Sequence, residues 1–210
     1  MSNLVRLSLL YRLCFQDIKR MSHFSFLLLL FKDEGRDIML VISPGHWKPG
    51  TGARGIIDEV TEARKVVREV AAIWSAHKYG HKVIVDNVSR NATQNLNYLI
   101  AQHRKYSFAR HFSVHFNAVA GTYERGIGCE VLYANSRMKD AAEQMCFAIC
   151  NASGLKFRGA KKRTNLRFLN AFPHSALLIE VCFVNSQTDV HLYKTYFNEI
   201  CNAIALTAVR

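Results

Sequence analysis

Apolar residues follow two repeating patterns along most of the chain. Short apolar runs, which are typical of buried strands, occupy residues 38–43, 81–86, 111–116, 126–134, 166–169 and 176–184. Between most of these runs, apolar residues recur at helical spacing and predict helices over residues 59–80, 93–106, 136–152 and 189–207. Four glycines and two prolines predict a loop over residues 44–55.

Strands that alternate with helices predict an α/β fold. We expect residues 39–210 to form a single domain with a mostly parallel mixed sheet of about six strands, covered by helices on both faces. No internal repeat and no Ser-, Gly- or Pro-rich linker divides this part of the chain. Sites in such sheets form at the carboxyl ends of the strands, so polar residues at those ends are candidate site residues.

Residues 1–38 do not continue this pattern, and three interpretations compete for them. The basic pair Lys19-Arg20 precedes an apolar stretch, as in a signal peptide, but charged residues 32–34 follow where a small-residue cleavage site should lie. An amphipathic membrane-binding helix is the second interpretation. We favour the third, in which this extension is extraneous or poorly ordered and the working protein starts at Met39, directly before the first strand.

The chain has 210 residues and is basic, with a net charge of +12. The extension carries only six of the 28 Lys and Arg residues and four of the 16 Asp and Glu residues, so most of the charge belongs to the main part. Basic chains are attracted to nucleic acids or to anionic cell envelopes. No helix-turn-helix, zinc-finger or RNA-recognition signature is present, so we expect no specific nucleic-acid partner. No apolar run reaches the roughly 18–20 residues of a membrane span.

Six cysteines are too few for a disulfide-built scaffold. Cys146 and Cys150 are four residues apart on a predicted helix and could share a metal ion. No second Cys/His pair follows at zinc-finger spacing, and most of the cysteines have apolar neighbours in the sequence. We therefore expect them to be small buried residues.

Four residues occupy positions that suit metal-assisted hydrolysis. His46 follows the first strand, Glu59 opens the first helix and His115 ends the third strand. Two imidazoles and a carboxylate form a known catalytic zinc shell. Glu180 interrupts the most apolar strand, where burying a carboxylate is costly. A nearby metal would offset that cost, and Glu180 could then move a proton.

Each of these residues also has a purely structural interpretation. His46 is one of nine histidines, and His115 could be an inward-facing strand residue. Glu59 could simply stabilise a helix N-terminus, and Glu62 competes with it for the role of ligand. Glu180 could pair with a basic residue. Without a His-Glu-x-x-His cluster, the spacing alone is a weak metal signal.

Six short motifs follow one another in residues 39–207. They are Pro44-Gly45-His46, Gly55-Ile56-Ile57-Asp58-Glu59, Ser113-Val114-His115-Phe116-Asn117-Ala118, Gly128-Cys129-Glu130-Val131, Arg158-Gly159-Ala160-Lys161 and Glu180-Val181-Cys182-Phe183-Val184-Asn185. In this order they resemble the zinc-dependent N-acetylmuramoyl-L-alanine amidases, the family of bacterial wall amidases and phage endolysins. Ser43 stands where many relatives have Asp, and the N-terminal extension has no counterpart in the family.

The resemblance implies a reaction and a role for each residue. One Zn²⁺ per chain would be bound by His46, Glu59 and His115, and Glu180 would be the general acid and base. The reaction would be hydrolysis of the amide between N-acetylmuramic acid and L-alanine in peptidoglycan. The residues expected to bind substrate are Asn117, Arg158 and Lys161. A zinc peptidase that cuts within the stem peptide is the main alternative, followed by a basic nucleic-acid-binding protein and a metal-free homologue that only binds wall.

The same resemblance sets the expected partners and location. Peptidoglycan and the anionic envelope would attract the basic chain, which we expect to act as a monomer on the cell wall or in the periplasm. A phage-encoded lysin would wait in the host cytoplasm before its release. Lys161 and Lys162 belong to the densest basic cluster, which either borders the substrate groove or is a solvated surface.

Overall fold

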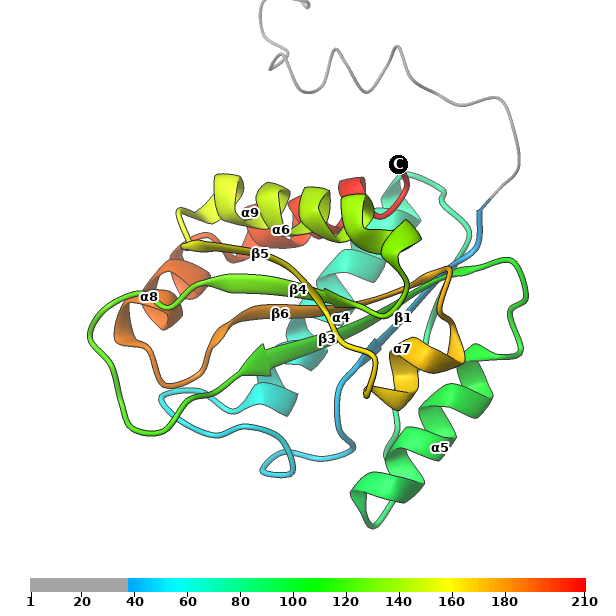
Figure 1. Ribbon diagram of the computed structural model, residues 1–210, viewed down its shortest axis with the longest axis horizontal. Coiled ribbons are helices and arrows are strands. Elements are labelled where there is room, and N and C mark those ends of the chain that lie inside the picture. The colour runs from blue at the N-terminus through cyan, green and yellow to red at the C-terminus, as the bar shows by residue number, and fades with distance from the viewer. Residues whose placement is uncertain (1–37) are drawn as a thin grey trace, which may run out of the picture. The chain divides into compact units, whose positions relative to one another are not determined.

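A computed structural model describes residues 38–210, and Figure 1 shows their arrangement. The first 37 residues, and with them the predictions made for the extension, lie outside the described residues. Six strands build one sheet: β1 (Leu40–Pro44), β2 (His81–Val83), β3 (Arg110–Asn117), β4 (Cys129–Tyr133), β5 (Phe157–Lys162) and β6 (Ala176–Phe183).

The order of strands across the sheet is β2-β1-β3-β6-β4-β5. The first four of these run parallel to one another, whereas β4 is antiparallel to β6 and parallel to β5. The predicted mostly parallel, mixed sheet is therefore confirmed. The topology also brings the amino ends of β4 and β5 to the edge where β1, β3 and β6 have their carboxyl ends.

The described residues also form six helices and a short 3₁₀ segment. They are α4 (Glu59–Ala76), α5 (Ala92–His103), η1 (Ser136–Met138), α6 (Lys139–Ser153), α7 (Arg167–Ala171), α8 (Gln187–Thr195) and α9 (Phe197–Thr207). Helices α8 and α9 follow the last strand, and the others lie between strands. Capping residues fix several of their ends. The Asp58 side chain accepts a hydrogen bond from the Thr61 amide at the start of α4, and Gly154 ends α6 in the left-handed conformation with φ of 74°.

The sheet is covered on both faces, as Figure 1 shows. Helices α4, α6 and α9 pack together on one face, and α5 and α7 lie on the other. Alternate strand residues supply the two layers: Leu40 and Ile42 of β1 point toward α4, whereas Val41 joins Leu99 of α5 in a smaller cluster. The predicted single-domain α/β fold is confirmed.

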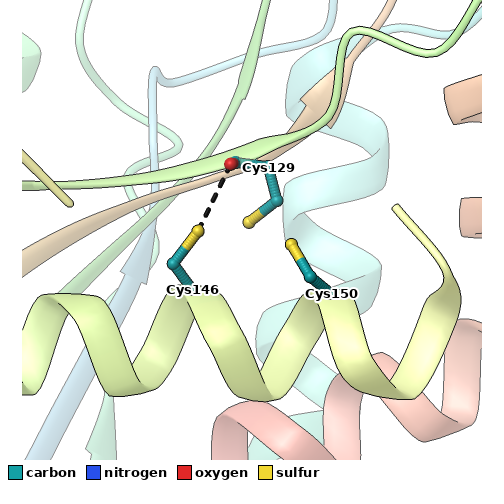
Figure 2. A group of neighbouring side chains, drawn as sticks. All are labelled: Cys129, Cys146 and Cys150. Atoms are coloured by element: carbon teal, nitrogen blue, oxygen red, sulfur yellow. Dashed lines mark hydrogen bonds between the residues drawn. The ribbon is translucent and has the colours of Figure 1, made fainter. Parts of the chain in front are cut away.

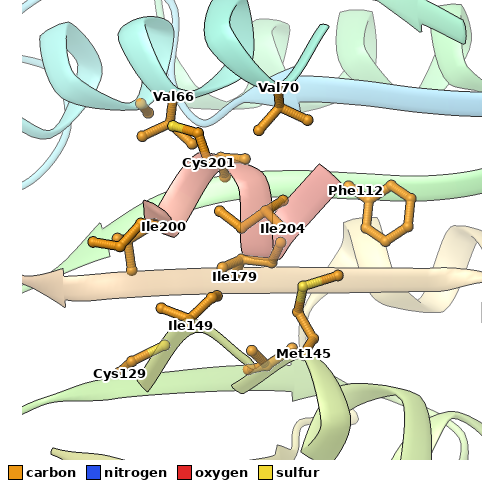
Figure 3. Close-up of a cluster of buried hydrophobic side chains, with 14 of the residues drawn as sticks. Val66, Val70, Phe112, Cys129, Met145, Ile149, Ile179, Ile200, Cys201 and Ile204 are labelled. Carbon is orange, nitrogen blue, oxygen red and sulfur yellow. The ribbon is translucent and has the colours of Figure 1, made fainter. Parts of the chain in front are cut away.

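The described cysteines are buried and free, as expected for small core residues. Cys129 of β4 faces Cys146 and Cys150 of α6, as Figure 2 shows. Cys201 lies in the same apolar layer, where α9 packs between α4 and α6 against the sheet residue Ile179 (Figure 3).

Two predicted elements are wrong. Residues 166–169 were expected to form a strand, but Arg167–Ala171 is helix α7, which buries the adjacent residues Phe168 and Leu169 together against β6. The sixth strand is instead β5, which lies at an edge of the sheet, where its basic and exposed residues are tolerated. The predicted final helix is also divided, with a break at Tyr196 between α8 and α9.

Helices that could cross a membrane were sought among residues 38–210. None is both long enough and apolar enough to do so.

Candidate metal centre

The residues predicted to carry the chemistry meet at one edge of the sheet. His46 follows β1, and His115 of β3 pairs in register with Glu180 of β6. Strand alternation places His115 and Glu180 on the face that α5 and α7 cover. The parallel strands thus bring together residues that are far apart in the sequence, as the strand-end rule predicts.

Glu59 reaches this edge from the first residue of α4. Its Oε2 lies 3.1 Å from His46 Nε2, and its Oε1 lies 2.9 Å from His115 Nδ1. The side chain of Glu59 is only 4% exposed, against 29% for His46 and 20% for His115. A buried carboxylate therefore stands between two imidazoles that solvent can reach.

The loop after β1 holds these groups close together. A Cβ atom on Gly45 would lie 2.2 Å from the His115 ring, and one on Gly52 would lie 2.4 Å from Glu59 Oε2. His46 itself adopts a φ of 62°, a conformation that few residues other than glycine accept without strain. The glycines are thus required by the close approach of backbone to the imidazole–carboxylate cluster.

The electrostatics of the cluster favour a charged carboxylate. Burial raises the pKa of Glu59, but hydrogen bonds to His115 and His46 outweigh it and hold that pKa well below its usual range. Burial lowers the pKa of His115, but its hydrogen bond to Glu59 and the charges of Glu180 and Glu59 raise it overall. The carboxylate is therefore ready to serve as an anionic ligand.

Glu180 has a different environment from Glu59. Burial and the charges of Glu59 and Glu130 raise its pKa to about 7, against a lowering effect of His115. Its Oε2 atom is buried and has no hydrogen-bond partner among the described residues. A carboxyl group that titrates near neutrality can both take and deliver a proton.

Glu62, the alternative carboxylate, points elsewhere. Its Oε1 lies 2.8 Å from Lys65 Nζ, and its Oε2 accepts a hydrogen bond of 2.9 Å from the Tyr193 hydroxyl. The contact with Tyr193 places this carboxylate beside α8, one turn of helix further along α4 than the two imidazoles. The geometry favours Glu59 as the carboxylate of the cluster.

A second polar network adjoins Glu180 and includes a residue to which sequence analysis assigned no role. Glu130 of β4 pairs in register with Glu180, accepts a hydrogen bond of 3.0 Å from Asn117 Nδ2 and lies 2.8 Å from Arg158 Nε. The Arg158 guanidinium also lies over the Phe183 ring, 5.0 Å from its centroid. The Gly-x-Glu-Val motif was the available signal, but only the antiparallel pairing of β4 with β6 places Glu130 beside Glu180.

Lys161 lies further along β5, opposite Leu132 of β4. Its side chain makes no hydrogen bond or ion pair within the described part of the chain. Glu130 and Leu132 lie on the same face of β4, and Lys161 is paired with Leu132, so Lys161 lies on that face too. Two residues along a strand place it about 7 Å from Glu130 in the strand direction. The structure therefore brings Asn117 and Arg158 together, and leaves Lys161 at a distance from them.

The donor set at the sheet edge suits a divalent metal. His46, Glu59 and His115 each offer one ligand atom, and these atoms all lie within 4.8 Å of one another. Two imidazoles and one carboxylate are the ligands of several catalytic zinc sites, which leave a fourth position open. The orphaned carboxylate oxygen of Glu180 supplies a polar neighbour for that position. The residues present thus fit a zinc ion.

Known proteins share this architecture. The structure resembles the catalytic domain of the CD27L endolysin targeting Clostridia difficile, with a TM-score of 0.74, 23% identity and coverage of 82% of this chain and 97% of that one. It also resembles the catalytic domain of an N-acetylmuramoyl-L-alanine amidase from Bacillus (Paenibacillus) polymyxa, with a TM-score of 0.65, 23% identity and coverage of 82% and 96%. At these identities the likeness concerns the fold.

Sequence comparison extends the likeness. An uncharacterized protein of Clostridium perfringens is 30% identical over 158 residues, which are 74% of this chain and 46% of the relative. The chain thus spans about half the length of this relative. The family model of the N-acetylmuramoyl-L-alanine amidases matches residues 40–208, nearly all of the described part. The chain therefore belongs to the N-acetylmuramoyl-L-alanine amidase family.

Proposed function

We propose that this protein hydrolyses the amide bond between N-acetylmuramic acid and L-alanine in peptidoglycan, as a zinc enzyme. The observation that carries the proposal is the cluster of His46, Glu59 and His115 beside Glu180, in a chain of this family. His46, Glu59 and His115 would hold one Zn²⁺ per chain. When bound, the metal polarises the scissile carbonyl and lowers the pKa of water to about 7.

Glu180 is the proton carrier in this mechanism. With a pKa of about 7, its carboxylate form takes a proton from the attacking water and its acid form delivers one to the leaving amine of L-alanine. Its buried and unpartnered Oε2 is free to make these hydrogen bonds.

Asn117 and Arg158 position the substrate. Both are held by Glu130, whose two carboxylate oxygens divide between them. The Arg158 side chain remains 34% exposed, so its guanidinium can still donate to an acceptor of the wall polymer. Lys161 extends this donor surface along β5, and we propose that it contacts more distant parts of the glycan or peptide.

The charge of the chain supports the same assignment. A net charge of +12 favours retention on an anionic envelope. We propose that the protein acts at the cell wall as a monomer, after release from the host cytoplasm if it is phage-encoded.

Mass spectrometry of digested peptidoglycan tests the function. The full chain, loaded with zinc, should release intact stem peptides with free L-alanine amino termini, and a chelator should abolish the release. The Glu180→Gln variant is the matched control for contaminating hydrolases. Products cut within the stem peptide would establish the peptidase alternative instead. An absence of products from the zinc-loaded chain and from residues 39–210 would refute both hydrolase assignments.

A further inference from the structure

A second potential ligand group lies in the interior, apart from the imidazole–carboxylate cluster. It consists of the thiols of Cys129, Cys146 and Cys150, whose Sγ atoms all lie within 4.8 Å of one another. Figure 2 shows the Cys129 side chain on the strand pointing toward the two helix side chains. Cys129 and Cys146 are 0% exposed, and Cys150 keeps 8% of its surface.

Local structure brings the three thiols together. Cys146 and Cys150 are one turn apart on the buried face of α6, which packs directly on β4 and β5. Cys129 begins β4 after Gly128, which has a φ of 110°. A Cβ atom on Gly128 would lie 2.0 Å from the Lys156 carbonyl oxygen, so only glycine allows the two backbone segments to approach this closely. This approach holds Cys129 in its position facing α6.

The neighbouring groups shift the pKa values of the three thiols in different directions. Bonds from Cys129 and Cys150, and from the backbone N–H groups of Gly159 and Arg158, lower the pKa of Cys146 to about 4. The bond to Cys146 raises the pKa of Cys129. The Cys146 thiol also donates to the Cys129 carbonyl oxygen at 3.3 Å, as Figure 2 shows, so polar contacts already join the helix thiols to the strand.

The number and type of the ligands decide which ion fits. Three sulfurs at about 2.3 Å from a central metal lie about 4 Å from one another, which small side-chain movements achieve here. Thiolates are soft ligands that favour Cu(I) and zinc. Structural zinc takes four ligands, whereas the group gathers three sulfurs and no imidazole or carboxylate within the described residues. Three-coordinate Cu(I) needs no fourth ligand.

We propose that Cys129, Cys146 and Cys150 form a buried trigonal site for a soft monovalent metal ion, Cu(I). Binding forms three Cu–S contacts, and the remaining thiol protons leave to solvent. Cys150 keeps some exposed surface, so the ion enters the site from solvent past this residue. The bound ion ties α6 to β4 and stabilises the folded state, because it binds that state and no preformed site exists in the unfolded chain.

Anaerobic titration with Cu(I) against a colorimetric chelator tests the proposal. The full chain, with Cys14→Ser to remove the thiol outside the described residues, should bind one Cu(I) that gives near-ultraviolet thiolate-to-metal absorption. Cys146→Ala should weaken binding by more than the ~10–100-fold that loss of an outer-shell partner costs. Cys201→Ala removes an equally buried thiol outside the cluster and should leave binding unchanged.

Two further measurements use the chain without substitutions in the cluster and so do not depend on a variant folding. X-ray absorption of the Cu(I)-loaded chain should give three sulfur neighbours at one distance, and Cu(I) should raise the melting temperature. Copper with nitrogen neighbours, or binding lost in His115→Ala but kept in Cys146→Ala, would overturn the site. Two Zn²⁺ per chain, with one lost in Cys146→Ala and no preference for Cu(I), would overturn the copper assignment.

Discussion

Two pairs of histidines lie on the same side of the sheet and differ in what surrounds them. His46 and His115 have ring centroids 5.4 Å apart, and His103 and His111 have ring centroids 5.3 Å apart. His111 and His115 even share strand β3 and its face. Between the first pair stands Glu59, whereas aromatic rings enclose the second.

The enclosed pair is held by neutral contacts. Nδ1 of His103 lies 3.1 Å from Nδ1 of His111, and its Nε2 lies 3.1 Å from Ser43 Oγ. The His111 ring stacks on Phe172 with a centroid distance of 4.1 Å. Burial lowers the pKa of His103 to about 3 and that of His111 to about 4, whereas the pKa of His115 is raised. His111 and His115 are four residues apart on β3, and the carboxylate of Glu59 from α4 beside only one of them accounts for the opposite shifts in their pKa values.

Removing one histidine from each pair should give the sharpest contrast. His115→Ala should lose bound zinc and fall to background amidase activity, because it leaves a two-ligand site. His111→Asn should keep zinc and activity while lowering stability, because it disturbs only the enclosed pair. Metal analysis and wall turnover on both purified variants check this. Zinc retained in full by His115→Ala would contradict the ligand assignment.

The two glutamates at the start of α4 provide an equally strict test. Glu59→Ala should lose zinc, because Glu59 lies between the imidazoles, whereas Glu62→Ala should retain it and lose the contacts to Lys65 and Tyr193. Metal content after dialysis measures the difference. Full zinc occupancy in Glu59→Ala, with loss in Glu62→Ala, would reverse the assignment.

Glu180→Gln separates proton transfer from metal binding. The amide keeps the shape of the side chain but cannot accept the proton, so kcat should fall by about 10²–10⁴-fold. Zinc content should not change, because Glu180 is not part of the ligand cluster. Steady-state rates on purified peptidoglycan, with metal analysis of the same sample, provide the measurement. Near-normal turnover would exclude Glu180 as general base.

The enclosed pair should make stability depend on pH. In the unfolded chain both imidazoles titrate near 6.5, but in the fold they remain neutral down to about pH 4. Between these values the unfolded chain binds more protons, so the free energy of unfolding falls as the pH is lowered. The loss should be about 2 kcal/mol for each imidazole at pH 5.

Denaturant unfolding between pH 7.5 and 5 measures this slope. The double variant His103→Gln/His111→Asn should have a flatter profile than the parent, because its amides do not titrate. His191→Gln, at an exposed position, is the matched control and should keep the parent slope. An unchanged slope in the double variant would show that other groups govern acid unfolding.

The contrast between these regions also shows what the sequence could predict. The continuous apolar run of β1 and the periodic face of α4 made both elements predictable, and with them the positions of His46 and Glu59. Strand β5 was missed because its residues Phe157–Lys162 are basic and lack the apolar alternation of a core strand. Its place at the sheet edge depends on pairing with β4, which no local pattern encodes.

Side-chain groups that depend on that pairing were missed for the same reason. The antiparallel pairing of β4 with β6 brings Glu130 beside Glu180. The packing of α6 on β4 brings Cys129 next to Cys146 and Cys150. The His103–His111 contact joins a helix end to a strand start. Motif spacing predicts which residues share an element, but contacts between elements follow from the three-dimensional packing.

Substitution of Glu130 should have the smallest effect on activity among these variants. In Glu130→Gln the amide can still accept from Asn117, but Arg158 loses its charged partner, so the guanidinium is less well positioned for substrate. We expect kcat/KM to fall about tenfold, or about 1.4 kcal/mol, through KM rather than kcat, with zinc unchanged. Glu143→Gln is the control, because Glu143 accepts a hydrogen bond from the Ala160 amide of the same strand β5.

A double-mutant cycle with Arg158→Gln decides how the effect arises. If Glu130 acts by holding Arg158, the two substitutions should be strongly non-additive, and the double variant should be little worse than either single variant. Additive losses would mean that Glu130 acts on Asn117 or Glu180 instead. A decrease confined to kcat would likewise place Glu130 in the proton transfer step and remove it from substrate positioning.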